Sequence, residues 1–271
     1  YPNTYRPPFK ADDAEDLGAQ CLEFLRTMIK KSTAGALSAI IIEPFQGTAG
    51  NVIPPKGFLE GVRTIAHEHG ALLIADEMIT GFGRTGKWFG VQHEDVSPDI
   101  MTVGKGMAGG FPVSGLISTE EISKSKPFAN PSGSSSSYGG NPLASAACNA
   151  TLKIVKKERL VEKSRRMGVH MLKRLKAMQE KYPFLGDVRG TGLMIGVEFV
   201  LDPKTKEPLP KPLCRRIFDE ALMRGLVTMA YSPVLRINPP LNITEKEADR
   251  GLDILDETFA AVAKEISCAA R

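Results

Sequence analysis

The chain has 271 residues, of which 42% are hydrophobic and 24% are charged, a composition typical of a folded globular protein with one or two α/β domains. Its net charge of +4 is small against 35 basic and 31 acidic residues, which argues against a nucleic-acid-binding surface. No apolar run reaches membrane-spanning length, and the first residues do not resemble a signal peptide.

The first half of the chain alternates helix and strand patterns. Residues 11–31 start with acids, show helical apolar spacing and end in lysines, which predicts a helix, and a second helix is predicted at 54–70. Strands that are apolar on both faces and alternate with helices indicate an α/β fold with a mostly parallel sheet. Short continuous apolar runs predict such buried strands within 36–44, 71–77, 98–106 and 111–119.

The pattern changes after a Ser/Gly-rich loop that ends at Pro142. A long helix is expected from there, and the basic run 153–176 is interpreted as a solvated helix face. The sequence predicts a major domain over 1–145 and a smaller α+β domain over 146–271. The elements expected in this smaller domain are a strand at 188–200, a helix at 212–225 and a closing helix at 245–266.

Cysteines and histidines give no sign of a metal site. The four cysteines are far apart and show no CxxC spacing, and the histidines of "HEH" at 67–69 would lie on different sides of a helix. A reducing compartment is the default for such cysteine usage, so the cytoplasm is expected.

Charged residues follow three of the predicted strands. Glu43, Asp76 and Lys105 each stand at the carboxyl end of an apolar run, the edge at which parallel sheets bind ligands. A structural ion pair is one interpretation. The other is a pyridoxal phosphate site, in which a lysine amine forms a Schiff base with the cofactor aldehyde and an aspartate holds the pyridine nitrogen protonated.

Pyridoxal phosphate chemistry requires both residue types. A ring with a protonated nitrogen draws electrons from the substrate carbon that loses a proton, and the lysine serves as the base that moves this proton. Glycines after each charged residue allow a flat ring to approach the backbone closely.

The chain resembles the class III aminotransferases of subgroup II, the ω-type enzymes of fold type I. The matching segments occur in the family's order and span essentially the whole chain. They are "IIEPFQGTAGNVIPP", "LLIADEMITGFGRTGKWFG", "PDIMTVGKGMAGGFPVSG", "SYGGNPLASAA", "VRGTGLMIGVE" and "LRINPPLNIT".

The resemblance implies a role for individual residues. Lys105 matches the Schiff-base lysine and Asp76 the pyridine-nitrogen aspartate, while Glu43 matches an acid near the active centre. Ser137 matches a position, usually threonine, whose hydroxyl reaches the cofactor phosphate of the neighbouring subunit. Arg236 matches the arginine that binds a substrate carboxylate bidentately.

The implied activity is transamination with pyridoxal 5'-phosphate. An amine or an ω- or α-amino acid would give its amino group to a small oxo acid, in a homodimer with shared active sites. The same fold also hosts decarboxylases, aminomutases and phospholyases, and a non-catalytic fragment is a further alternative. A simple nucleotide-binding domain is disfavoured because "TVGKGMAGG" lacks the GxxxxGK[ST] spacing.

The sequence departs from the family pattern at two positions near the cofactor and substrate. Thr48 stands where many members that use glutamate or 2-oxoglutarate carry an acid that pairs with the arginine. Ile79 replaces a frequent glutamine beside the cofactor, which is similar to several pyruvate-using transaminases. Together these residues favour pyruvate over 2-oxoglutarate as the acceptor.

The third departure concerns the family's N-terminal portion. That portion holds a phosphate-binding turn with its helix N-terminus and an aromatic residue that stacks on the ring, and residues 1–35 supply neither. The chain is therefore expected to be the C-terminal portion of a longer enzyme and to bind the cofactor poorly by itself.

Overall fold

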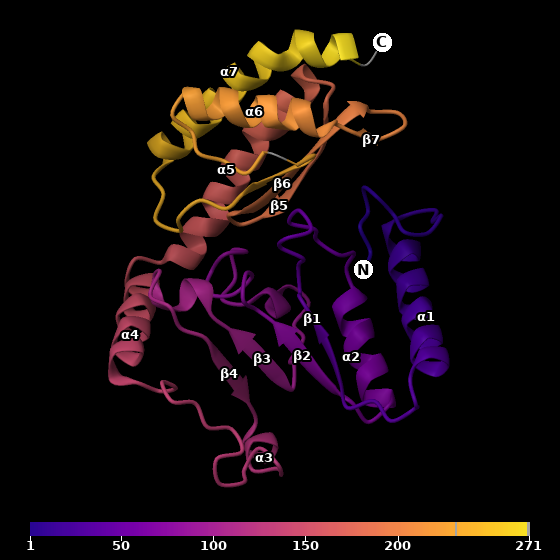
Figure 1. Ribbon diagram of the computed structural model, residues 1–271, viewed down its shortest axis with the longest axis vertical. Coiled ribbons are helices and arrows are strands. Elements are labelled where there is room, and N and C mark those ends of the chain that lie inside the picture. The colour runs from indigo at the N-terminus through magenta and orange to yellow at the C-terminus, as the bar shows by residue number, and fades with distance from the viewer. Residues whose placement is uncertain (231, 270–271) are drawn as a thin grey trace. The chain divides into compact units, whose positions relative to one another are not determined.

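The structure is a computed structural model that describes residues 1–230 and 232–269 (Figure 1). By its internal contacts the chain forms two compact units. Unit 1 comprises Tyr1–Phe45, Pro54–Phe82 and Lys87–Arg159, and unit 2 comprises Gln46–Ile53, Gly83–Gly86 and Leu160–Arg271. These units divide after residue 159, and the domain boundary expected after residue 145 stays a prediction.

Unit 1 is built on a four-stranded sheet in the order β1-β2-β3-β4 (Figure 1). The strands β1 (Ala39–Ile42), β2 (Leu72–Asp76) and β3 (Ile100–Val103) run parallel, and β4 (Gly115–Ser118) pairs antiparallel with β3. The four predicted strands and the mostly parallel sheet are thus confirmed.

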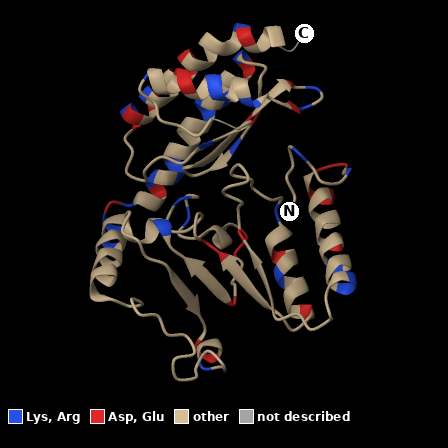
Figure 2. Cartoon of the chain, viewed as in Figure 1, with Lys and Arg blue, Asp and Glu red and all other residues tan. Residues whose placement is uncertain are grey.

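Two helices flank the β1 and β2 side of this sheet. Helix α2 (Phe58–Glu68) contacts both strands, and α1 (Ala14–Ser32) packs on α2. Helix α1 begins where the Asp13 side chain accepts a hydrogen bond from the backbone N–H of Asp16, and it carries acids in its first turn and lysines in its last (Figure 2). The core between these elements is formed by residues such as Leu17, Leu59 and Leu73.

Four further helices belong to the described part of unit 1. The short η1 (Gly90–His93) lies between β2 and β3. The short helices η2 (Lys105–Ala108) and α3 (Glu120–Ser123) and the longer α4 (Pro142–Lys157) follow β3. The long helix predicted from Pro142 is confirmed as α4, but the basic run 153–176 is divided between two helices and is not one helix face. Helix α4 ends at Lys157 because Arg159 adopts a left-handed φ of 52°, and α5 (Leu160–Lys181) begins as a separate helix.

Unit 2 contains a second, antiparallel sheet centred on β6. Strand β6 (Met194–Asp202) pairs with β5 (Leu185–Thr191), β7 (Glu207–Pro208) and β8 (Val234–Ile237). The single strand predicted at 188–200 is therefore wrong. A tight turn divides it, because Gly192 takes a left-handed φ of 54° and has no space for a side chain, a Cβ there lying 2.4 Å from the Thr85 carbonyl carbon.

Three helices complete unit 2. Helix α5 contacts β5 and β6, α7 (Glu245–Ala269) contacts β6 and α5, and α6 (Lys211–Met223) packs on α7. The buried rings of Phe184, Phe199 and Phe259 lie 5.8–6.4 Å apart at the centre of this core. None of the helices described has the length and apolar character that crossing a membrane requires.

Candidate active site

Three neighbouring strand ends in unit 1 bring three of the predicted residues to one edge of the sheet. Asp76 is the last residue of β2, Glu43 directly follows β1, and Lys105 is the second residue after β3. The three strands are adjacent and parallel, so their carboxyl ends lie along the same edge. In open α/β sheets this edge is where ligands bind.

Hydrogen bonds fix the Asp76 carboxylate at its strand end. Its Oδ1 accepts from the backbone N–H of Met78 at 3.1 Å and from the hydroxyl of Thr102 at 3.2 Å. Thr102 is the register partner of Asp76 across the β2–β3 pair. The carboxylate is half-buried, and an oriented carboxylate of this kind stabilises a protonated nitrogen beside it.

Lys105 is exposed and has an unusual backbone. Its φ of 43° lies in the left-handed region, which residues other than glycine rarely adopt. A Cβ at the preceding Gly104 would lie 2.9 Å from the Met78 sulfur, so a side chain there would require Met78 to move. A strained backbone persists only where the surrounding structure holds it in place, and such residues cluster at functional sites.

Glu77 is a residue of this region that the sequence analysis missed. Its side chain is fully buried, and its carboxylate accepts from the backbone N–H groups of Gly90 and Val91, each at 2.8 Å, and from the Thr80 hydroxyl. Burial raises the pKa of the Glu77 carboxyl, although these hydrogen bonds oppose the shift. Glu77 therefore ties the turn that follows Asp76 to the start of η1. Its place directly after the charged Asp76 gave no signal in the sequence that its side chain is buried.

Ile79 and Ser137 occupy different surroundings in unit 1. Ile79 is half-buried in the turn that follows β2, close in sequence to Asp76. Ser137 lies in the segment 124–140, in which every residue is exposed. Because Ser137 is expected to serve the site of a neighbouring subunit, a single chain leaves that role a prediction.

Arg236 lies on β8 in unit 2 and borders a small cavity of about 260 Å³. Thr48, the residue that replaces the family's acid, lines the same cavity, so the structure brings these two predicted residues together. No acid is among the residues described as lining it, which are Thr48, Ala49, Met229, Ser232, Pro233, Val234 and Arg236.

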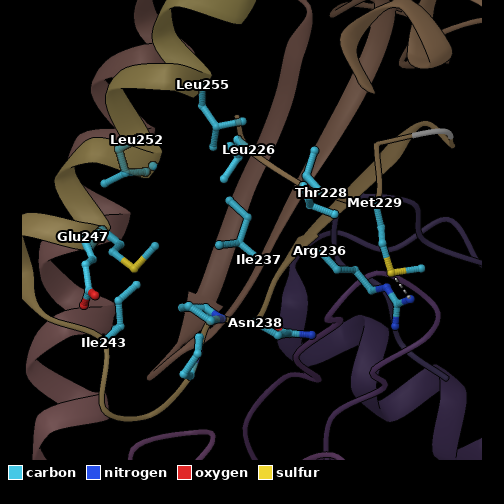
Figure 3. Close-up of a pocket in the computed structure, with 16 residues that line it drawn as sticks. Leu226, Thr228, Met229, Arg236, Ile237, Asn238, Ile243, Glu247, Leu252 and Leu255 are labelled. Atoms are coloured by element: carbon cyan, nitrogen blue, oxygen red, sulfur yellow. Dashed lines mark hydrogen bonds between the residues drawn. The ribbon is translucent and has the colours of Figure 1, made fainter. Parts of the chain in front are cut away.

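A second cavity of about 490 Å³ is also lined by Arg236 (Figure 3). Its wall is mostly apolar and includes Ile237, Leu252 and Leu255, with Glu247 on α7 also lining it. A guanidinium N–H of Arg236 donates to the Met229 sulfur at 3.8 Å (Figure 3). A cation bordered by an apolar cavity suits an anionic group that carries an apolar part.

Arg84, in the glycine-rich segment after β2, holds a loop. Its guanidinium is half-buried and donates to the carbonyl oxygens of Leu193 at 3.1 Å and Pro239 at 2.5 Å. Burial lowers the pKa of Arg84 to about 10. Pro239 lies in the segment that follows β8, so Arg84 anchors the chain just after Arg236.

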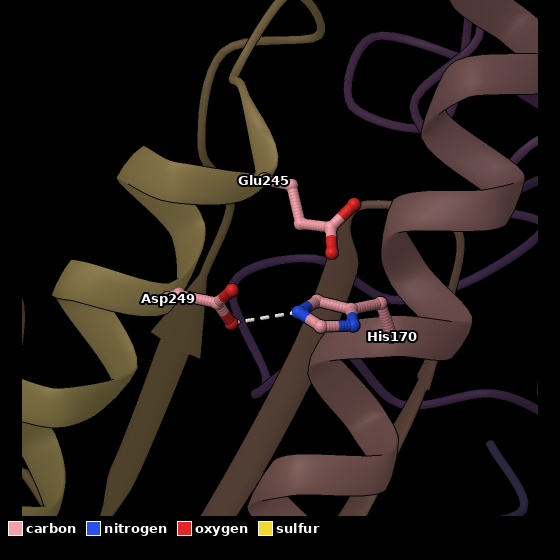
Figure 4. A group of neighbouring side chains, drawn as sticks. All are labelled: His170, Glu245 and Asp249. Atoms are coloured by element: carbon pink, nitrogen blue, oxygen red, sulfur yellow. Dashed lines mark hydrogen bonds and ion pairs between the residues drawn. The ribbon is translucent and has the colours of Figure 1, made fainter.

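One group of metal-ligand residue types lies between α5 and α7 (Figure 4). The ligand atoms of His170, Glu245 and Asp249 lie within 4.8 Å of one another. The Asp249 carboxylate already accepts from His170 at 2.7 Å and from the Arg174 guanidinium at 2.9 Å. Since this positive charge would repel a cation, we interpret the group as an ion-paired contact between two helices.

Comparison with known proteins decides the family. The family model "Aminotransferase class-III" matches residues 1–259. The chain belongs to the class-III aminotransferase family. It is 39% identical over 263 residues to a leucine/methionine racemase of Thermococcus litoralis and 34% identical over 275 residues to a taurine–pyruvate aminotransferase of Bilophila wadsworthia.

The matches cover nearly all of this class-III chain but only part of its relatives. The chain is covered to 97% and 96%, whereas the racemase and the aminotransferase are covered to 58% and 59% of their lengths. Its fold is also similar to a PLP-bound amine transaminase from an uncultivated Pseudomonas species, with a TM-score of 0.89, 34% identity, and coverage of 96% of this chain and 60% of that one. The fold is accordingly that of fold type I.

The residues at the strand ends fit the cofactor of this family. Class-III aminotransferases use pyridoxal 5'-phosphate, whose aldehyde requires an amine and whose ring nitrogen requires an acid. Lys105 carries an amine and Asp76 a carboxylate at the carboxyl ends of two neighbouring parallel strands, and Thr102 orients the Asp76 carboxylate.

Proposed function

We propose that the protein containing this chain is a pyridoxal-phosphate-dependent transaminase that moves an amino group from an amine or an ω- or α-amino acid to a small oxo acid. One observation carries the proposal: Asp76 and Lys105 stand at the carboxyl ends of two adjacent parallel strands. In this arrangement the carboxylate would contact the ring nitrogen of the cofactor, and the amine would bond to its aldehyde carbon. Glu43 and Ile79 are proposed to border the same ring.

The two residues have separate tasks in this proposal. When bound, the cofactor withdraws electrons from the substrate carbon that loses its proton. Asp76, oriented by Thr102, keeps a proton on the ring nitrogen and so sustains this withdrawal. Lys105 anchors the cofactor through its Nζ and, once released by substrate, accepts a proton at Nζ from the substrate carbon and returns it one step later.

The acceptor is proposed to be pyruvate rather than 2-oxoglutarate. Arg236 binds the substrate carboxylate through its planar fork of N–H donors. Thr48 lines the same cavity and offers a hydroxyl instead of a carboxylate, and the lining residues described include no acid. An arginine without an acidic partner in this cavity is available to the carboxylate of every substrate, which suits donors and acceptors that carry one carboxylate.

A homodimer with shared active sites is part of the proposal. The exposed segment 124–140 contains Phe128 and Tyr138, whose side chains are 45% and 85% accessible, and exposed apolar groups of this size favour association. Ser137 lies beside Tyr138 and would reach the cofactor phosphate of the partner. Mixing Lys105→Ala and Ser137→Ala subunits tests this arrangement, since a shared site predicts partial recovery of activity in the mixed dimer.

The visible absorption spectrum of the complete protein that contains this chain, with added pyridoxal phosphate, tests the core of the proposal. A band of the covalently bound cofactor is expected in the wild-type protein, and the Lys105→Ala variant is expected to lack it. Addition of an amino donor should then leave pyridoxamine phosphate as the product of the half-reaction. Folded wild-type protein without this band would contradict the proposal.

Amino-acid racemisation is a second candidate, supported by the 39% identity to a leucine/methionine racemase. It uses the same proton removal at the α-carbon but returns the proton to the opposite face. Incubation of L-leucine in D₂O separates the two functions. A racemase yields deuterated D-leucine and retains the cofactor aldehyde, whereas a transaminase yields the oxo acid.

A further inference from the structure

We propose that Arg189 is a positioning residue for carboxylate recognition. It holds the loop 46–53 against β6 and β8, and it thereby fixes Thr48 beside Arg236. The inference deepens the proposed function, on which it depends for the identity of the ligand as a substrate carboxylate. All residues that carry it belong to unit 2.

The loop 46–53 is closed at its base by backbone hydrogen bonds. Gln46 and Val52 form an antiparallel bridge with N–H to carbonyl distances of 3.0 and 2.9 Å. At the tip, the Gly47 carbonyl accepts from the N–H groups of Gly50 and Asn51. The exposed Thr48 is therefore carried on a compact hairpin-like tip whose position depends on what holds that tip.

Arg189, on β5, holds this tip through its guanidinium. Its Nη2 donates to the Gly50 carbonyl at 2.7 Å, and its Nε donates to the Asn51 carbonyl at 3.2 Å. The same guanidinium is ion-paired with Asp187 at 2.7 Å and with the buried Glu198 at 2.9 Å. The two carboxylates orient the planar guanidinium so that its remaining N–H groups point at the loop.

The loop backbone lies directly on the strand that faces Arg236. A Cβ at Gly196 would meet the Gly50 carbonyl oxygen at 2.3 Å, so only glycine allows this approach. Gly196 is the register partner of Arg236 in the β6–β8 pair. Gly50 itself has a φ of 113°, and a Cβ there would lie 2.6 Å from Val234. These close contacts fix the position of Gly50, and with it the tip of the loop, beside Arg236.

Asn51 provides a second attachment for the tip. Its fully buried side chain donates to the Ile195 carbonyl and to the Asn238 side chain, each at 2.8 Å. Loss of the two Arg189 bonds should therefore loosen the tip without releasing it. The expected consequence is a weaker grip on carboxylates with little change for neutral ligands of the same shape.

Binding of butanoate and of butanamide to the complete protein tests this inference. The variant Arg189→Lys keeps a positive charge beside Glu198 but lacks the fork, and Arg174→Lys is the matched control in an ion pair that lines neither cavity. Ligand-observed NMR would give the two dissociation constants. We expect Arg189→Lys to weaken butanoate binding about tenfold, or about 1.4 kcal/mol, and to leave butanamide binding unchanged.

Amide hydrogen exchange supplies a readout that does not depend on any ligand. The N–H groups of Gly50 and Asn51 should exchange faster in Arg189→Lys and at the wild-type rate in Arg174→Lys. Should Arg189→Lys not fold, Asn51→Ser, which removes the other attachment, must show the same selective loss of butanoate.

Several results would overturn the inference. They are unchanged butanoate affinity in Arg189→Lys, an equal loss in Arg174→Lys, an equal loss for butanamide, or a wild-type protein that binds both ligands alike. Butanoate binds in unit 2 and needs no cofactor in this assay. Failure of the absorption test with Lys105 would therefore contradict the proposed transaminase and leave this result interpretable.

Discussion

Replacing Glu77 by glutamine tests how the segment after Asp76 is held. The carboxylate accepts three hydrogen bonds, two of them from backbone N–H groups, and glutamine offers one oxygen in place of two. Whichever way the amide turns, the N–H of Gly90 or of Val91 loses its acceptor. A buried donor without a partner costs about 1–3 kcal/mol, so the free energy of unfolding of Glu77→Gln should fall by about that amount.

The pH dependence of this deficit follows from the pKa of Glu77. Burial raises this pKa above its unfolded value of about 4.3, so the folded state favours the protonated carboxyl. The corresponding stability is fully present below the unfolded pKa and is lost as the pH rises through the folded pKa. Glutamine has no such titration. The deficit of the variant should therefore be largest in acid and shrink as the pH rises.

Urea unfolding at acidic and neutral pH measures both effects. The single tryptophan, Trp88, lies two residues before Gly90, and its fluorescence reports on this segment. Glu23→Gln, at an exposed position of α1 in the same unit, is the matched control. A deficit that grows with pH would refute the reasoning, because it would show that the hydrogen bonds outweigh burial and that the ionised carboxylate is the stabilised form.

Three further substitutions have defined outcomes. Thr48→Glu places an acid in the cavity that Thr48 and Arg236 line. Because the new carboxylate would pair with Arg236 and compete with the ligand, butanoate binding should weaken about tenfold. Tighter binding would contradict this. Gly168→Ala puts a Cβ 2.0 Å from the Gly192 carbonyl oxygen. The free energy of unfolding, measured by urea titration, should fall by at least about 1–3 kcal/mol. Wild-type stability of this variant would disprove the contact. Thr102→Val removes a hydrogen bond from Asp76 and should shift the pH dependence of the bound cofactor's absorption, with an unshifted profile counting against its orienting role.

The sequence located the elements of unit 1 well because its strands are continuous apolar runs between clear helix patterns. It missed two breaks. The predicted strand contains three glycines, Gly190, Gly192 and Gly196, and the sequence does not show which of them turns the chain. The end of α4 falls within a charged helical pattern, and only the left-handed backbone at Arg159 reveals it.

The sequence predicts candidate site residues where a charged side chain follows a strand, because parallel sheets bind ligands at the carboxyl ends of their strands. Asp76 and Lys105 are the first charged residues after two apolar runs, so their positions at strand ends could be predicted. Arg236 was proposed through resemblance, and the cavity that it shares with Thr48 could not be predicted, because the fold brings these distant segments together. Glu77 was missed because a charged residue beside another charged residue gives no sign that its side chain turns into the core.

The interleaving of the two units bears on how the chain folds. Residues 46–53 and 83–86 complete unit 2, although the chain around them belongs to unit 1. Their bonds join partners 138 positions apart, from Asn51 to Arg189, and 155 positions apart, from Arg84 to Pro239. Contacts of such high sequence separation slow folding, since a long loop must close before they form. Unit 2 can be completed only after Pro239 has left the ribosome, and a cut after residue 159 would yield two fragments that each hold part of it.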